Sequence, residues 1–261
     1  MGINFTRSYD LGQEYGCIKG RATEILGEYL KYSNIIKFGD VDERVTFTTE
    51  RLIPTKSTQR PNVMLLFSNP HPHSIQQGMF LSANTKNKEN LFWPCMRNAG
   101  WFSIPESKRN PKQLRDIFLE VKYSGPFKLY FYCYYAFPTR YPIHILRIFG
   151  KRFFTQHIEP EAKNEFRKTT LEIAPDAIIT FNKDIFNLVS EDKIERYLDL
   201  LKKGKLVQSR IRGINRDIPV FLTYPTGWRY HKEYMELRKD SLETIKAAIL
   251  QRLNASVNYS T

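Results

Sequence analysis

The chain has 261 residues, of which 41% are hydrophobic and 14% aromatic, enough to close one sizeable core. Its 40 lysines and arginines outnumber its 27 aspartates and glutamates, and the net charge of +13 favours a polyanionic partner. The amino-terminal residues lack a basic region followed by an apolar one, and no apolar run approaches the roughly 20 residues of a membrane span. We therefore expect a cytoplasmic protein with no membrane partner.

The three cysteines are sparse and far apart. Cys17, Cys95 and Cys133 form no pair at the spacing of zinc or redox motifs, which indicates a reducing compartment. No linker separates two cores, so we expect one domain over residues 1–261, with residues 1–60 as a helical extension packed on it. We expect a monomer with no cofactor and no obligate protein partner.

The first elements are predicted from the spacing of apolar residues. Residues 21–32 carry one apolar stripe, which predicts a packing helix. Residues 45–52 alternate and predict a short edge strand. The apolar run at residues 63–67 has no polar alternation and ends at Asn69 and Pro70, which predicts a strand buried on both faces.

Strands and helices alternate along the rest of the chain. Further strands are predicted at residues 127–137, 176–182 and 218–224. Helices are predicted to begin at Asn110-Pro111, to cover residues 161–172, to run from Ser190 to Gly204, and to begin at the capping box Asp240 to Glu243. Four buried strands alternating with helices predict an α/β fold, a three-layer sandwich around a four-stranded, mostly parallel sheet.

The loop after the first buried strand holds the first candidates for chemistry. In open parallel sheets, ligands bind beyond the carboxyl ends of the strands. Pro70 and Pro72 fix the backbone there, so Asn69, His71 and His73 are presented at a defined place. These three residues are our candidate catalytic groups.

Two of the strand-end loops resemble the two signature motifs of the uracil-DNA glycosylase superfamily. The first motif is Asn69-Pro70, followed by Gln76, Gly78 and Phe80. The second is Tyr224-Pro225-Thr226-Gly227, near the carboxyl end. The Asn-Pro form is closest to the single-strand-selective and mismatch-specific branches, and the resemblance extends over about residues 60–253. It implies a monofunctional DNA glycosylase of the uracil-DNA glycosylase fold, acting on DNA in base excision.

The resemblance also implies roles for individual residues. Asn69 would orient the attacking water, the backbone near Pro70 and His71 would touch the base or sugar, and Phe80, with Gly78 before it, would stack on the flipped base. The second motif would enter the minor groove through Tyr224, Pro225, Thr226, Gly227 and Trp228.

Two positions depart from the family pattern and leave the base open. Tyr224 stands where several branches have a histidine that stabilises the leaving base, and Tyr134 or Tyr135 falls near the base-reading asparagine. Asn182, at the end of the third strand, is a further candidate for base contact. The substrate can therefore be uracil or another modified pyrimidine, in repair or in defence against foreign DNA.

Residue chemistry suggests how the open roles are filled. Base excision builds negative charge on the departing base, and the imidazole of His71 or His73 can donate to it. A basic and aromatic cluster, Trp228, Arg229 and Lys232, follows the second motif. An aromatic wedge with phosphate-binding cations is what base flipping requires.

Two alternatives remain open from the sequence. His71 and His73 also resemble the metal pair of amidohydrolases, with His144, His157 or His231 completing the site of a metal-dependent hydrolase. The chain can also be a non-catalytic DNA-binding protein of the same fold.

Overall fold

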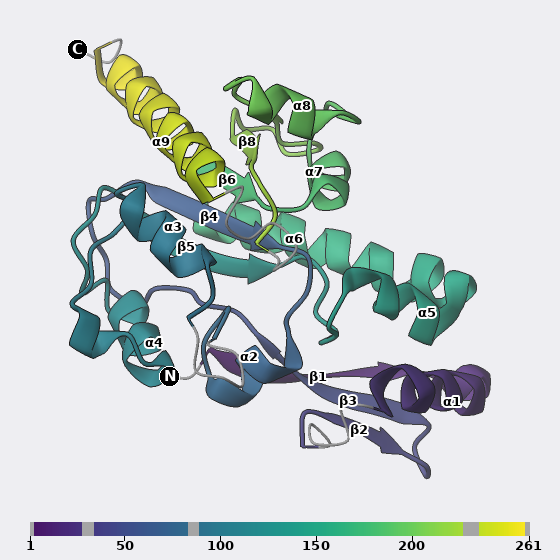
Figure 1. Cartoon of the computed structure of the whole chain (residues 1–261). Coiled ribbons are helices and arrows are strands. Elements are labelled where there is room, and N and C mark those ends of the chain that lie inside the picture. The colour runs from purple at the N-terminus through teal and green to yellow at the C-terminus, as the bar shows by residue number, and fades with distance from the viewer. Residues whose placement is uncertain (1–2, 28–33, 83–88, 227–234, 259–261) are drawn as a thin grey trace.

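The computed structural model describes residues 3–27, 34–82, 89–226 and 235–258 (Figure 1). The strands are β1 (Asn4–Asp10), β2 (Ile36–Gly39), β3 (Arg44–Glu50), β4 (Asn62–Phe67), β5 (Lys128–Cys133), β6 (Ala177–Thr180), β7 (Gln208–Arg210) and β8 (Pro219–Leu222). The α-helices are α1 (Tyr15–Leu26), α2 (Pro72–Gln77), α3 (Phe92–Asn98), α4 (Pro111–Leu119), α5 (Pro142–Phe153), α6 (Glu159–Ile173), α7 (Lys183–Val189), α8 (Tyr197–Lys202) and α9 (Met235–Asn258).

The central sheet has the strand order β5-β4-β6-β8-β7. Strands β5, β4, β6 and β8 run parallel to one another, and β7 pairs antiparallel with β8 at the edge. The expected α/β fold with a mostly parallel sheet is confirmed, but the sheet has five strands instead of four. The extra strand, β7, has three residues, Gln-Ser-Arg, and carries no apolar run by which the sequence could predict it.

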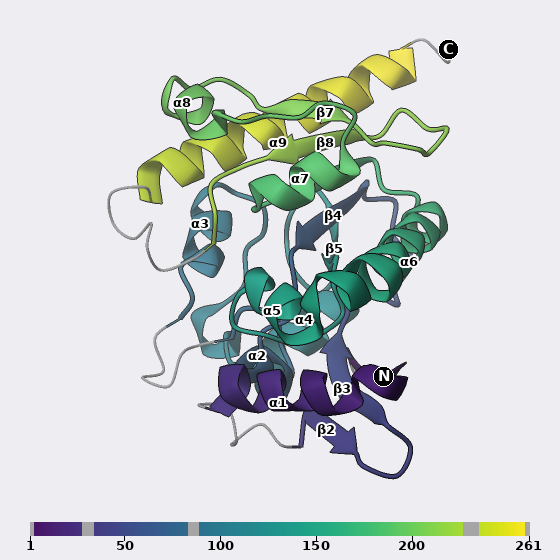
Figure 2. The same ribbon diagram turned by 90° about the vertical axis from the view of Figure 1, so that its right-hand side faces the viewer.

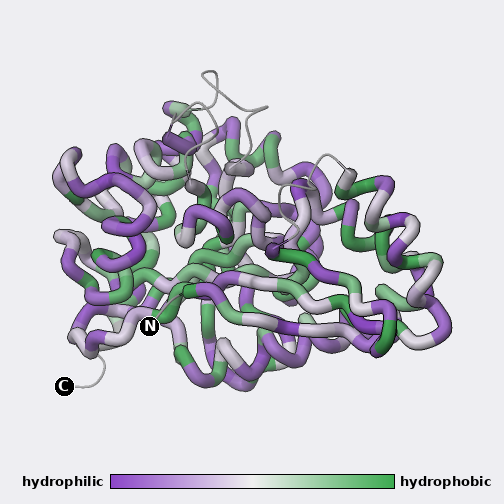
Figure 3. Tube along the Cα trace, turned by 90° about the horizontal axis from the view of Figure 1, so that it is seen from below, coloured by the Kyte–Doolittle hydropathy of each residue, from purple (hydrophilic) through white to green (hydrophobic). Residues whose placement is uncertain are grey.

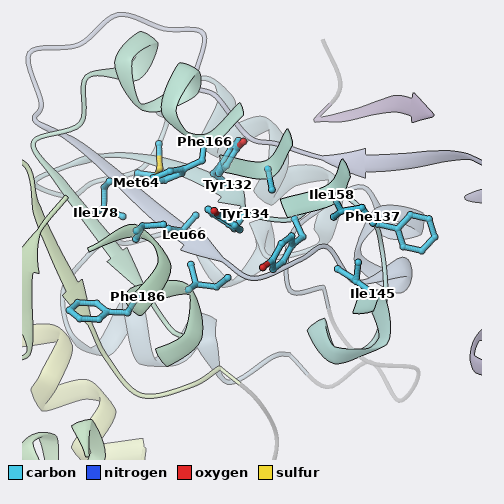
Figure 4. Packing of buried hydrophobic residues seen from close by; sticks show 14 of the residues in the cluster. Met64, Leu66, Tyr132, Tyr134, Phe137, Ile145, Ile158, Phe166, Ile178 and Phe186 are labelled. Atoms are coloured by element: carbon cyan, nitrogen blue, oxygen red, sulfur yellow. The ribbon is translucent and has the colours of Figure 1, made fainter. Parts of the chain in front are cut away.

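Both faces of the central sheet are covered, which explains the unbroken apolar run of β4. Val63 and Leu65 belong to one hydrophobic cluster, which α3, α4 and α9 complete. Met64 and Leu66 belong to the other, which α6, α7 and α8 complete (Figure 4). Strands that are buried on both faces need no polar alternation. The result is a three-layer α/β arrangement (Figures 1 and 2).

The amino-terminal part of the chain corrects two expectations. Residues 1–60 are not a helical extension, because β1, β3 and β2 form a three-stranded antiparallel sheet beside α1. Strand β3 is central in this sheet, not an edge strand. Its alternation buries Val45 and Phe47 against the main core. Leu52, which follows β3, forms an isolated antiparallel bridge with Phe131 of β5. Figure 3 shows the apolar residues concentrated along the inner strands.

Helix boundaries follow the capping rules at one site and not at another. Asn110 caps α4 as expected, since its Oδ1 accepts from the backbone N–H of Gln113 at 2.9 Å. The prediction of a helix starting at Ser190 was wrong. Ser190 ends α7 and its hydroxyl donates to the carbonyl of Phe186 at 2.7 Å, while α8 begins at Tyr197.

The last helix begins before the capping box that was expected to start it. Within the described residues α9 already runs from Met235, so Asp240 lies inside the helix, and its carbonyl accepts from the hydroxyl of Thr244 at 2.8 Å. A local capping motif was outweighed by helical sequence on its amino-terminal side. Across the described parts of the chain, no helix combines the length and the apolar character needed to cross a membrane.

Candidate functional site

Hydrogen bonds join the loops that follow β4 and β5 at the carboxyl edge of the sheet. The backbone N–H of Tyr135 donates to the carbonyl of Ser68 at 2.8 Å, and that of Thr139 donates to the carbonyl of Pro70 at 3.1 Å. The parallel pairing of β4 with β5 therefore continues past the strands themselves. It brings the second proline loop against Asn69.

The side-chain amide of Asn69 is held in one orientation. Its Nδ2 donates to the carbonyl of Thr139 at 2.7 Å, to the hydroxyl of Thr139 at 3.0 Å and to the carbonyl of Pro70 at 3.0 Å. Its Oδ1 accepts from the hydroxyl of Ser68 at 3.2 Å. A carbonyl oxygen has two lone pairs, so Oδ1 can still accept a hydrogen bond from water. Sequence reasoning missed Thr139, because nothing in the sequence reveals a contact 70 residues away.

His71 combines a structural role with a chemical one. It is the N-cap of α2, and its Nδ1 accepts from the backbone N–H of His73 at 3.2 Å. The neutral ring then carries its proton on Nε2, which makes that atom a donor. His73 lies in the first turn of α2, and both imidazoles are half-buried.

Gly78 and Phe80 occupy structural positions. Gly78 ends α2 with a φ of 72°, in the left-handed region that favours glycine. The ring of Phe80 is 2% exposed and packs 5.7 Å from Phe67 and 5.5 Å from Phe131, between ring centroids. It also lines a cavity of about 410 Å³ beside Trp93 of α3. Phe80 is thus a core residue here, and the stacking role implied by the resemblance would require its face to be uncovered.

Tyr134 and Tyr135 are also buried. Their ring centroids lie 5.0 Å apart with the planes at 90°, and Tyr135 packs against Phe154. Burial raises the pKa of Tyr134 to about 12, and Glu159 adds to the effect. Burial likewise raises the pKa of Tyr135. Both phenols are therefore neutral near pH 7, where the family pattern has an amide.

Asn182 caps the helix that follows β6. Its Oδ1 accepts from the backbone N–H of Asp184 at 2.8 Å and of Ile185 at 3.1 Å. Both bonds satisfy groups that the first turn of α7 leaves without helical partners. The side-chain oxygen of Asn182 is therefore used within the fold, and only its Nδ2 takes no part in the cap.

The loop after β8 begins at the same edge. The backbone N–H of Thr223 donates to the carbonyl of Thr180 at 3.1 Å. Tyr224 is fully buried in the hydrophobic cluster of α6 and α7, while Pro225 and Thr226 are half-buried. The other expected DNA-binding residues of this region, Gly227, Trp228, Arg229 and Lys232, lie outside the described residues.

A buried arginine that the sequence did not indicate holds this second loop. Arg238 of α9 is 1% exposed, and its Nη2 donates to the carbonyl of Pro225 at 2.6 Å. Its Nη1 contacts the sulfur of Cys95 at 3.8 Å. A helical arginine normally suggests a solvated face, so only the packing of α9 reveals this role.

A second buried charged residue, Glu50, lies where β3 approaches β5. It lines a cavity of about 20 Å³ with Cys133 and Arg7, and within the described residues its Oε2 has no hydrogen-bond partner. Burial raises the pKa of Glu50 well above its ordinary value of 4.5. The unfolded chain therefore loses this proton at a lower pH than the folded protein does.

We predict that Glu50→Gln stabilises the protein as pH rises. Below pH 4.5 both states of the wild type hold the proton, and above it folding must retain a proton that the unfolded chain releases. The wild type therefore loses stability with rising pH, and the variant lacks this loss. Urea unfolding should show a larger gain in the free energy of unfolding for the variant at pH 8 than at pH 5. Exposed Glu24→Gln is the control, and equal pH dependence in all three proteins would contradict the prediction.

The metal interpretation depends on ligands beyond the two histidines. In the residues that the structure describes, no group of three or more histidine, cysteine, aspartate or glutamate side chains is placed to share a metal ion. The ring of His144 packs 5.3 Å from that of Tyr141, and the ring of His157 packs 4.5 Å from that of Phe153. His231, the remaining candidate, lies outside the described residues.

The carboxyl edge of the sheet thus brings together an oriented amide, a hydroxyl and an imidazole whose tautomer is fixed by its capping bond. Such groups can position a water molecule and donate hydrogen bonds to a leaving group. They come from Asn69, Thr139 and His71, and the loop after β8 begins at the same edge of the sheet. No family model matches the sequence, and no curated protein matches it.

Proposed function

We propose that this chain is a monofunctional DNA glycosylase of the uracil-DNA glycosylase type. It cleaves the N-glycosidic bond of a flipped, damaged or modified base by attack of water. The observation that carries the proposal is the fixed amide of Asn69, whose Nδ2 is taken by Thr139 and Pro70 while Oδ1 can accept from water. Its position directly after β4, at the carboxyl edge of a parallel sheet, supports the resemblance of the two motifs.

The reaction needs little from the protein beyond positioned groups. The sugar gains positive charge as the base departs, so a weakly activated water suffices and an amide can orient it. Negative charge builds on the base, and the Nε2 proton of His71 is the donor that we assign to it, since Nδ1 accepts from the backbone N–H of His73. The net charge of +13 favours a polyanionic substrate such as DNA.

A panel of modified duplexes tests the activity. Purified protein should leave abasic sites in DNA that contains uracil or another modified pyrimidine, and the panel includes hypoxanthine, mismatched thymine and hypermodified cytosine. We expect the activity to persist in EDTA, because the assigned roles fall to Asn69 and His71 without a metal. Alkaline cleavage of labelled strands measures the abasic sites.

Two outcomes would favour the alternatives. Loss of activity in EDTA with recovery in zinc would support a metal-dependent hydrolase that uses His71 and His73. Tight binding to DNA without abasic product from any base would support a non-catalytic DNA-binding protein of this fold.

A further inference from the structure

A ridge of exposed basic and apolar side chains follows β5. We call Arg140, Tyr141, Ile143, Arg147 and Lys151 the basic ridge; all five are exposed. The side chains of Tyr141 and Ile143 are unusually open for large apolar groups, at 45% and 49% exposure. Scattered apolar residues need no explanation, but two beside a row of cations form a surface with defined chemistry.

The charged residues near the ridge in the sequence are all basic. No aspartate or glutamate occurs between Glu120 and Glu159. In the described part of the chain, no ion pair joins Arg147 or Lys151 to a carboxylate. The guanidinium of Arg140 lies 5.2 Å from the centre of the Tyr141 ring. Arg147 and Lys151 therefore present positive charge to an anion.

The ridge is fixed to the candidate site by a chain of hydrogen bonds. The hydroxyl of Thr139 accepts from Nδ2 of Asn69 at 3.0 Å and donates to the carbonyl of Tyr141 at 2.8 Å. The ridge therefore begins directly beside the residue that orients Asn69. Helix α5, which carries the rest of the ridge, extends beyond the carboxyl ends of the strands (Figure 1). Its backbone is broken at Gly150, where φ is 76°, so Arg147 precedes the break and Lys151 follows it.

We propose that the basic ridge binds the backbone of duplex DNA on one side of the extruded nucleotide. Arg147 and Lys151 contact phosphates, and Tyr141 and Ile143 pack against the sugars between them. The choice of DNA as partner rests on the proposed function, and the placement rests on the link through Thr139. Cations with an apolar strip match a backbone that alternates phosphate and sugar. An anionic membrane or an acidic protein would match the charge but would not need the ridge beside Asn69.

The test compares two pairs of charges on different faces. Arg147→Gln with Lys151→Gln removes two cations from the ridge. Arg167→Gln with Lys168→Gln removes the same two residue types from the carboxyl-terminal part of α6, which leads back to the amino end of β6. Fluorescence anisotropy measures binding of full-length protein to a duplex that carries a tetrahydrofuran abasic analogue, over a range of salt concentrations. The ridge variant should bind on the order of tenfold more weakly, and its salt slope should fall by roughly 0.9 for each phosphate that the variant no longer neutralises.

The outcomes separate this inference from the proposed function. If the wild type binds the duplex tightly while the two variants lose the same affinity or none, the proposed role of the ridge is overturned. This result would leave the glycosylase proposal unaffected. DNA binding that depends on the ridge, with no abasic product from any base, would support the proposed role of the ridge. It would contradict the proposed glycosylase activity. Binding of phosphatidylserine vesicles that depends on the ridge, without affinity for DNA, would overturn both. Tyr141→Ser with Ile143→Ser should weaken duplex binding without changing the salt slope.

Discussion

Replacing Asn69 with alanine should lower the single-turnover rate of base release by roughly 100-fold or more, on the order of the cost of one preorganised polar group. DNA affinity should change little, because the amide is uncharged and its Nδ2 is held by the carbonyls of Thr139 and Pro70. Single-turnover rates and binding constants on the same duplex measure the two effects separately. Thermal unfolding of the variant confirms that it is folded.

Two further variants sharpen this prediction. Asn69→Asp should not restore the rate, because a carboxylate in place of Nδ2 would face the carbonyl oxygens of Thr139 and Pro70 at about the same short distances. Asn164→Ala, which removes an exposed amide from α6, is the matched control and should retain the wild-type rate. Full activity in Asn69→Ala would show that the loop after β4 is not catalytic. It would therefore contradict the proposed function.

Replacing Arg238 with methionine should destabilise the protein and weaken DNA binding together. The variant leaves the carbonyl of Pro225 without the donor that now lies 2.6 Å away, and the loss of a hydrogen bond from a charged donor costs about 1.5–3 kcal/mol. The loop after β8 loses its anchor at the same time, so, if the proposed function holds, the loop binds DNA less well because its position is less defined. Differential scanning fluorimetry and anisotropy measure the two effects.

Arg252 of the same helix supplies a matched control. Its Nη2 also donates to a backbone carbonyl, that of Asp217, at 2.6 Å, but the side chain is 42% exposed. Exposed pairs of this kind contribute about 0–1 kcal/mol, so Arg252→Met should have a small effect. Arg238→Lys should recover part of the loss, since an ammonium group can still donate to Pro225. Equal effects of methionine at 238 and 252 would show that burial of Arg238 does not position the loop.

Elements with a strong local signal could be predicted from the sequence. The unbroken apolar run of β4 indicated a strand covered on both faces, and the Asn110-Pro111 pair marked the start of α4. The alternation of buried strands with helices indicated the α/β class and a mostly parallel sheet. It also placed Asn69 and His71 at the carboxyl edge, because loops that follow parallel strands must lie there.

Contacts between distant residues emerge only when the chain is folded. Thr139 meets Asn69 because β4 and β5 pair in parallel, and Arg238 meets Pro225 because α9 packs beside the loop after β8. The burial of Phe80 is likewise a property of its neighbours and not of its motif. The described part of residues 1–60 formed a three-stranded sheet beside α1 instead of a helical extension, since β1 and β2 become stable strands only when β3 pairs with both of them. Local sequence does not identify such distant partners, so these contacts are determined by tertiary packing.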